Sequence, residues 1–160
     1  MIRVGHGYDV HRFGVGNHVW LGGVRIEHDQ GLIAHSDGDV LIHALSDALL
    51  GAAALGDIGG LFPDTSDEWA GLAGHRMLQL VRARLQASGF APVQCDGTIV
   101  AQAPRIAPHV PAMCARIADG LGIGVGQVNV KATTTERLGF TGRGEGIAAQ
   151  AVATLIREDF

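Results

Sequence analysis

Aromatic side chains are scarce in this sequence, and cysteine is almost absent. Phenylalanine, tryptophan and tyrosine make up 5% of the 160 residues, so we expect an aliphatic core. The only cysteines, Cys95 and Cys114, form no C-x-x-C pair. They fit neither a disulfide framework nor a zinc finger, and we therefore expect reduced thiols and a cytoplasmic protein.

Long apolar runs and clusters of basic residues are missing as well. No apolar run is long enough to span a bilayer, and the chain enters a predicted strand at once, without the features of a signal peptide. The formal net charge is −4, and lysine and arginine form no run. These absences argue against a membrane protein and against general nucleic-acid binding.

The length and the hydrophobic periodicity predict one domain over residues 1–160, of the α+β class. We expect a two-layer sandwich with a mixed four-stranded sheet and helices on one face, which leaves the other sheet face free for contacts between subunits. The predicted strands and hairpin are 2–11, 19–26, 93–103 and 125–133, and the predicted helices are 69–88, 109–121, 147–157 and one that begins near residue 40.

The helix near residue 40 combines an apolar face with polar side chains. Ser36 or Asp37 is expected to cap it, because a short side-chain oxygen accepts from a free backbone N–H of the first turn. Apolar residues at i, i+3 and i+4 spacing place one face on the core. His43 lies at the edge of that face, where a lone histidine is more often a core residue than a metal ligand.

Asp9 and His11 change the interpretation of His43. They lie two residues apart in a predicted strand, so their side chains point to the same side of it. With His43 they would supply two imidazoles and one carboxylate, a donor set that suits zinc and leaves a fourth position open. The alternative is that Asp9 and His11 merely pair with each other at the end of a strand.

Three loops are candidates for binding a nucleotide or a phosphate. Residues 133–136 offer three threonines and Glu136, which could hold phosphate oxygens and a magnesium ion, although threonine also favours strands for structural reasons. Residues 139–145 form a glycine-rich loop without the P-loop pattern, and its Arg143 would serve equally well in an ion pair. Residues 101–107 have small side chains suited to a flat base, or form an ordinary proline-bracketed turn.

Six segments together resemble the family of 2-C-methyl-D-erythritol 2,4-cyclodiphosphate synthases. They span nearly the whole chain: GHGYDVH at 5–11, AHSDGDV at 34–40, GDIG at 56–59, LFPDT at 61–65, AQAP at 101–104 and NVKATTTERLGFTGRGEGI at 129–147. The resemblance implies a metal-dependent phosphorus–oxygen lyase of non-mevalonate isoprenoid biosynthesis. Its substrate would be 4-diphosphocytidyl-2-C-methyl-D-erythritol 2-phosphate, its products the cyclodiphosphate and CMP, and its assembly a homotrimer with active sites between subunits.

The resemblance also assigns roles to individual residues. Asp9, His11 and His43 would bind Zn²⁺, Glu136 would lie near a second metal, Mg²⁺ or Mn²⁺, and His35 and Thr134 would stabilise the transition state. The implied substrate contacts are Asp9, Val10, His11, His35, Ser36, Asp57, Ile58, Gly59, Phe62, Pro63, Asp64, Thr65, Ser66, Ala101, Gln102, Ala103, Pro104, Arg105, Ile106, Ala107, Thr133, Thr134, Thr135, Glu136, Phe140 and Arg143.

The sequence departs from the family pattern at two positions, and two other functions stay open. Gly60 stands where lysine is common and Ser66 where aspartate is common, which affects the expected substrate affinity more than the chemistry. A metal-dependent phosphohydrolase or phosphodiesterase could use the same donor set. A trimeric nucleotide-binding regulator without turnover could use the glycine loops, but it would leave the predicted metal triad unexplained.

Overall fold

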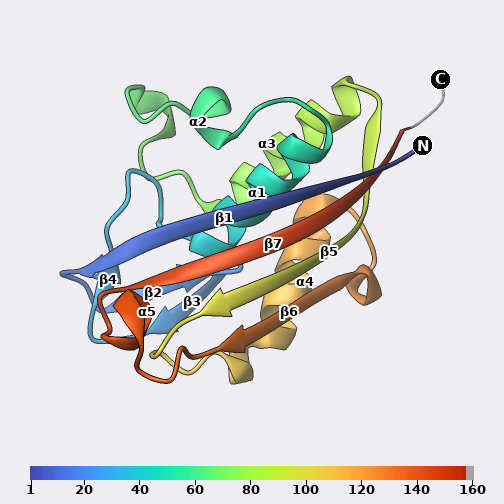
Figure 1. The fold of residues 1–160 in the computed structure, drawn as a ribbon. Helices are drawn as coiled ribbons and strands as arrows, with labels where there is room; N and C mark the ends of the chain where they lie inside the picture. Colours follow the sequence, from blue (N-terminus) through green and yellow to red (C-terminus); the bar gives the residue numbers. More distant parts are fainter. Residues whose placement is uncertain (158–160) are drawn as a thin grey trace.

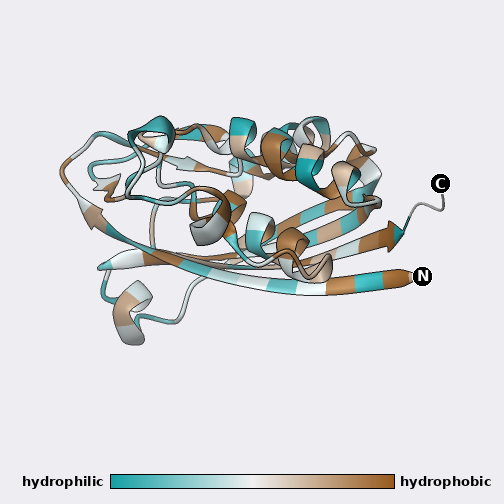
Figure 2. Cartoon of the chain, turned by 90° about the horizontal axis from the view of Figure 1, so that it is seen from above, coloured by the Kyte–Doolittle hydropathy of each residue, from teal (hydrophilic) through white to brown (hydrophobic). Residues whose placement is uncertain are grey.

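A mixed β-sheet and a layer of helices make up the fold of the computed structural model, which describes residues 1–157. The sheet order is β4-β1-β7-β5-β6, and only β5 and β6 are parallel neighbours. Three long helices cover one face of this sheet, and the opposite face is free of them (Figure 2). The strands are β1 (Ile2–Gly14), β4 (Gly31–Leu32), β5 (Phe90–Val100), β6 (Val128–Thr133) and β7 (Gly146–Arg157), and the long helices are α1 (Val40–Ala52), α3 (Gly74–Ala87) and α4 (Val110–Leu121).

The expected α+β class is confirmed, but the sheet has five strands rather than four. The hairpin of β2 (His18–Leu21) and β3 (Val24–Glu27) forms a separate two-stranded sheet, while β4 and β7 join the main sheet (Figure 1). The short helices are α2 (Ile58–Leu61), α5 (Gly139–Gly142) and the 3₁₀ turns η1 (Asp67–Trp69), η2 (Ala107–His109) and η3 (Val125–Gln127). Residues 158–160 of the expected domain lie outside the described part.

The prediction of a helix over residues 147–157 is wrong, because this segment is the central strand β7. It pairs with β1 on one side and with β5 on the other. Its alanine content favours a helix by propensity, but alternate residues from Ile147 to Leu155 are buried, with a period of two. Small side chains suit a central strand because α1 packs directly onto it.

Other boundaries differ by a few residues from the prediction. The helix expected from residue 69 begins at Gly74, after the η1 turn, and the strand expected from residue 93 begins at Phe90. The strand expected from residue 125 begins at Val128, because the preceding residues form η3. The core is one continuous cluster of mainly aliphatic side chains between the sheet and the helices.

Two glycines in β1 allow α1 to lie against the strand. A β-carbon at Gly5 would overlap the carbonyl oxygen of Ala48, and one at Gly7 would overlap that of Ala44. Any larger residue would therefore push the helix away from the sheet. This close approach brings His43, which is on α1, next to the side chains of β1 that point to the same side.

Asp39, rather than Ser36 or Asp37, caps α1. Its carboxylate accepts hydrogen bonds from the backbone N–H of Ile42 at 3.0 Å and from Gly22 and Gly23, in the β2–β3 turn, at 2.9 and 2.7 Å. Burial raises the pKa of Asp39 to about 6, and the nearby charge of Asp37 adds to this, against the opposing effect of the three N–H donors. One buried carboxylate thus fixes both the start of α1 and the position of the hairpin.

The uncovered sheet face carries large apolar side chains. Exposed residues on it alternate along β1 and β7 with residues that face the helices. They include Ile2, Val4, Tyr8, Val10, Val152 and Ile156. Within residues 1–157, no helix has both the length and the apolar character needed to cross a membrane.

Candidate active site

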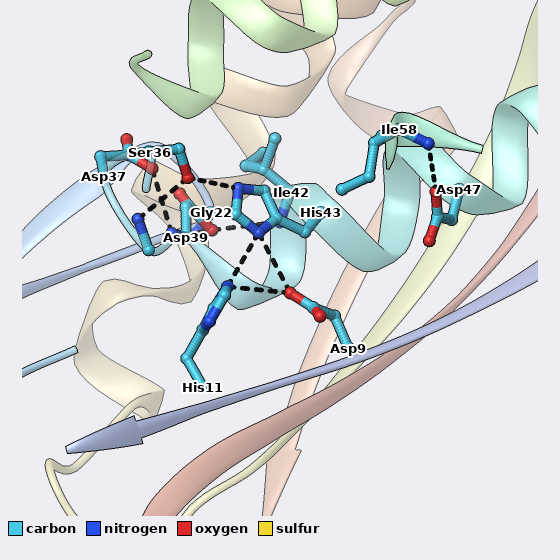
Figure 3. Close-up of polar contacts among 11 residues, drawn as sticks. Asp9, His11, Gly22, Ser36, Asp37, Asp39, Ile42, His43, Asp47 and Ile58 are labelled. Carbon is cyan, nitrogen blue, oxygen red and sulfur yellow. Dashed lines mark hydrogen bonds and ion pairs between the residues drawn. The ribbon is translucent and has the colours of Figure 1, made fainter. Parts of the chain in front are cut away.

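Asp9, His11 and His43 meet in one small triangle, as the sequence predicts (Figure 3). The Nε2 atom of His11 lies 2.9 Å from the Nδ1 atom of His43 and 3.0 Å from the Oδ2 atom of Asp9. The third side, from His43 Nδ1 to Asp9 Oδ2, is 3.0 Å. Strand β1 supplies two of the side chains and α1 the third, so the packing of the helix on the glycines of β1 assembles the group.

The triangle fits a divalent metal ion. A tetrahedral site with ligand bonds of 2.0–2.1 Å separates its donor atoms by about 3.3 Å, close to the spacing seen here. Two imidazole nitrogens and one carboxylate oxygen form a donor set that zinc accepts, and three protein donors leave a further position for a ligand. The prediction that Asp9, His11 and His43 form a group able to hold a metal ion is confirmed.

The electrostatics of the triangle favour a bound cation. Burial alone would raise the pKa of Asp9, but hydrogen bonds from His11 and His43 and their charges hold this pKa well below its usual value. Burial alone would lower the pKa of His43, yet its hydrogen bond to Asp9 and the charges of Asp9, Asp39 and Asp37 raise it. The site thus keeps a carboxylate ionised and stabilises positive charge beside it.

The triangle lies at the wall of a cavity of about 340 Å³. Further wall residues come from the segment before α1, from α2 and from the turn that follows it. The lining residues are Asp9, His11, Ala34, His35, Ser36, His43, Ile58, Gly59, Phe62, Asp64, Trp69, Leu72 and Met77. Its shape and mixed lining are those of a small-molecule site.

A second group of predicted residues lies at the ends of β5 and β6. The backbone N–H of Ala101 donates to the carbonyl of Thr133 at 3.0 Å, and Gln102 Oε1 accepts from the N–H of Arg137 at 3.3 Å. The loops 101–107 and 133–136 therefore lie side by side. None of their residues lines the cavity, because β7 and β5 lie between β1 and β6.

Comparison with known proteins decides the family. The family model described as YgbB matches residues 2–156, nearly the whole chain. The chain belongs to the YgbB family. It is 64% identical over 156 residues to the 2-C-methyl-D-erythritol 2,4-cyclodiphosphate synthase of Stutzerimonas stutzeri, with 98% of this chain and 99% of the relative covered. It is 59% identical to the enzyme of the same name from Vibrio cholerae, with 97% and 98% covered.

Solved structures of the YgbB kind share the fold as well. The bifunctional IspDF of Campylobacter jejuni has a TM-score of 0.95 and 43% identity, and the match covers 99% of this chain and 43% of that one. The IspF of Plasmodium falciparum in a CDP complex has a TM-score of 0.85 and 32% identity, with 99% and 97% covered. The resemblance inferred from the six sequence segments is thereby confirmed.

Several of the substrate contacts expected for a YgbB protein surround the cavity. His35, Ser36, Ile58, Gly59, Phe62 and Asp64 line it. The Nε2 atom of His35 lies 3.2 Å from the carbonyl oxygen of Ser66, so the end of the segment 62–66 contacts His35. Asp57 caps α2, because its side chain accepts a 2.9 Å hydrogen bond from the backbone N–H of Gly60.

Three residues that are predicted to contact the substrate lie outside the cavity lining. The side chain of Val10 is on the uncovered sheet face, since neighbouring residues of a strand point to opposite sides. Arg143 pairs with Glu145 at 2.9 Å, as the ion-pair alternative expected. Phe140 is on α5, outside the cavity lining.

The loop after β6 has an unusual backbone. Glu136 and Arg137 both adopt positive φ angles, 55° and 64°, which residues other than glycine seldom do. The hydroxyl of Thr134 accepts from the Glu136 N–H at 3.2 Å and supports the turn. Backbone of this kind is often found at functional sites.

No sequence pattern established a role for Asp47. Its Oδ1 atom accepts a 2.8 Å hydrogen bond from the backbone N–H of Ile58, so it ties the turn at α2 to α1 (Figure 3). Burial raises the pKa of Asp47, while this N–H donor opposes the shift. Its position four residues after His43 was the only signal in the sequence, and the partner on α2 could not be foreseen from it.

Proposed function

We propose that this chain is a 2-C-methyl-D-erythritol 2,4-cyclodiphosphate synthase of non-mevalonate isoprenoid biosynthesis. It converts 4-diphosphocytidyl-2-C-methyl-D-erythritol 2-phosphate into the 2,4-cyclodiphosphate and CMP. One observation carries the proposal: the chain matches curated enzymes of this name at about 60% identity over nearly their full length. The donor triangle beside a cavity is consistent with a metal-dependent lyase.

The reaction requires that the substrate be positioned correctly, and it needs no nucleophile from the protein. An oxygen of the 2-phosphate attacks the β-phosphorus of the diphosphate and forms a new P–O bond. The bond from the β-phosphorus to the oxygen that bridges to the α-phosphorus breaks, and that oxygen leaves with CMP. Such a transfer depends on folding the anionic substrate back on itself and on neutralising charge on the phosphoryl oxygens.

Within the cavity, the chain's own groups would bind and orient the erythritol part of the substrate. His35, Ser36, Ile58 and Gly59 are among the residues that line the cavity. His35 would donate a hydrogen bond to a phosphoryl oxygen as charge develops there. The apolar wall of Phe62, Leu72 and Met77 would limit access of water to the reacting phosphorus.

The loops at the ends of β5 and β6 would hold the cytidine and the diphosphate. Residues 101–107 offer backbone groups to the base, and the hydroxyls of residues 133–135 offer hydrogen bonds to phosphate oxygens. The CDP complex of the Plasmodium falciparum relative supports a cytidine nucleotide as ligand. Thr134 would act on the transition state, and Phe140 and Arg143 would be further contacts.

We propose that two metal ions take part in the reaction. Zn²⁺ held by Asp9, His11 and His43, and Mg²⁺ or Mn²⁺ near Glu136, would polarise phosphoryl oxygens and neutralise charge on the diphosphate. The donor set and the 3 Å triangle support the zinc assignment. The carboxylate of Glu136, in a loop rich in hydroxyls, supports a harder ion there.

We also propose that the enzyme is a homotrimer with active sites between subunits. Two metals that bind the same diphosphate must lie within a few ångströms of each other, as in two-metal sites, where the ions are about 3.5–4 Å apart. The strands β1 and β6 are three places apart in the sheet, which separates their ends by about 14 Å. Glu136 would then come from a neighbouring subunit. The exposed apolar side chains of β1 and β7 support an interface on that face.

We also propose that the enzyme has a single catalytic domain and is located in the cytoplasm. One continuous core joins the described elements, which supports a single catalytic domain over residues 1–160. Cys95 and Cys114 are both free and buried, as in proteins of a reducing compartment, and this supports the cytoplasm.

Incubation of the protein with the cytidyl substrate and a divalent metal tests the function. We expect stoichiometric CMP and cyclodiphosphate, detected by ³¹P NMR and mass spectrometry. A hydrolase would give CMP with an open-chain bisphosphate, and a binding regulator would give no product. The Glu136→Gln variant should lose most of the turnover while it keeps its zinc.

A further inference from the structure

Ser36 lies directly behind the metal-facing ring of His43. Its Oγ atom is 2.9 Å from the Nε2 atom of that ring (Figure 3). The other ring nitrogen, Nδ1, is the one that faces Asp9 and His11. The imidazole is therefore held from both sides, by the donor triangle on one and by a serine hydroxyl on the other.

The roles of the two nitrogens fix the direction of this hydrogen bond. A histidine that binds a metal through Nδ1 has its lone pair there, so the ring proton is on Nε2. That N–H donates to Ser36 Oγ. The backbone N–H of Gly38 also points to the same oxygen, at 3.4 Å. Two N–H donors then occupy the lone pairs of Ser36, and its own hydroxyl proton is free to be donated elsewhere.

We propose that Ser36 is a positioning residue for the metal ligand His43, and that it accepts the hydrogen bond from the proton on Nε2 of the His43 ring. The inference rests on the proposed metal site and goes beyond a substrate contact. Partners that accept the second N–H of a metal-binding histidine fix its tautomer and ring orientation, and their loss costs 10–100-fold in metal affinity.

Zinc affinity distinguishes this role from a substrate contact alone. Apoprotein of the full chain is titrated with zinc against a chromophoric chelator. We expect Ser36→Ala to bind zinc 10–100-fold more weakly than the native chain, and Ser36→Thr, which keeps the hydroxyl, to bind within a few-fold of it. No substrate is present, so a residue that only contacts substrate would leave the affinity unchanged.

Ser46→Ala is the matched control. Ser46 is buried on the same helix, three residues after His43, and its hydroxyl has no hydrogen-bond partner among the described residues. Removing this hydroxyl tests for a general effect of the serine-to-alanine change on α1. We expect native zinc affinity in Ser46→Ala and native far-UV circular dichroism in all three variants.

A second measurement reports the tautomer itself. Long-range ¹H–¹⁵N NMR of the zinc-loaded chain should show the His43 ring proton on Nε2, in slow exchange in the native chain and in Ser36→Thr, and in fast exchange in Ser36→Ala. If His43→Ala keeps full zinc affinity, the proposed metal site itself fails. If His43→Ala loses zinc while Ser36→Ala binds like the native chain, only the role of Ser36 is overturned.

Discussion

The Nδ1 atom of His43 lies 3.0 Å from the Oδ2 atom of Asp9, although 34 residues separate them in the chain. The contact depends on the missing β-carbons of Gly5 and Gly7, which let α1 touch the backbone of β1. A short strand motif and a helix thus become one donor triangle.

Removing one of the three proposed ligands should abolish metal binding. We expect about one zinc per subunit in the native chain and almost none in His43→Ala, with the fold retained, because the apolar face of α1 does not depend on His43. Mass spectrometry measures the metal content, and circular dichroism measures whether the fold is retained. His75→Ala is the control, since His75 pairs with Asp119 between α3 and α4. Full zinc occupancy in His43→Ala would refute the site.

Asp47 should affect substrate binding without affecting zinc. Asp47→Ala leaves the Ile58 N–H without its partner and loosens the turn at α2 that lines the cavity. The loss of one such hydrogen bond is worth about 1 kcal/mol, and we expect KM for the cytidyl substrate to rise several-fold. Asp47→Asn keeps an acceptor oxygen and should have a smaller effect. An unchanged KM in Asp47→Ala would show that the tether is dispensable.

Asp39 should make the folded state respond to acid in a specific direction. Its pKa is raised from 3.8 to about 6, so between these values the folded chain binds more protons at this residue than the unfolded chain does. The contribution of Asp39 to the free energy of unfolding is therefore fully present below pH 4. It falls as the pH rises towards 6, by up to about 3 kcal/mol.

Asp39→Asn removes this titration and serves as the reference. Chemical denaturation at fixed protein concentration gives the free energy of unfolding of both chains from pH 4 to pH 7. The stability of the native chain relative to Asp39→Asn should decrease up to about pH 6 and then level off. A constant difference across this range would mean that the pKa of Asp39 is not raised.

Mixed trimers test the proposed division of the active site between subunits. His43→Ala and Thr134→Ala would damage different halves of each site, so co-refolded mixtures should regain about a quarter of the native activity per site by random assembly. Mixtures of His43→Ala with Asp9→Ala damage the same half and should stay inactive. Equal inactivity of both mixtures would contradict sites shared between subunits.

The metal triangle was predictable because each part of it has a local signal. Alternation in β1 places Asp9 and His11 on one side, and helical spacing places His43 at the edge of the apolar face of α1. Their meeting was inferred from chemistry, because two imidazoles and a carboxylate form a donor set that suits zinc. The family resemblance supplied the substrate, which spacing alone did not reveal.

The features that were missed depend on tertiary contacts. β7 reads as a helix by composition, and only its pairing with β1 and β5 makes it a strand. The bonds that Asp39 accepts from Gly22 and Gly23 require the β2–β3 turn, and the role of Asp47 requires the N–H of Ile58. In each case the partner is distant in sequence or carries no side-chain signal, so local patterns could not identify it.

Turnover in water enriched in oxygen-18 tests the central claim most directly. If the 2-phosphate oxygen of the substrate is the nucleophile, no water oxygen enters either product. Mass spectrometry of the cyclodiphosphate and of CMP should then find no label in either of them. Label in one of the products would mean that water attacks phosphorus, and the chain would be a hydrolase instead of a cyclising lyase.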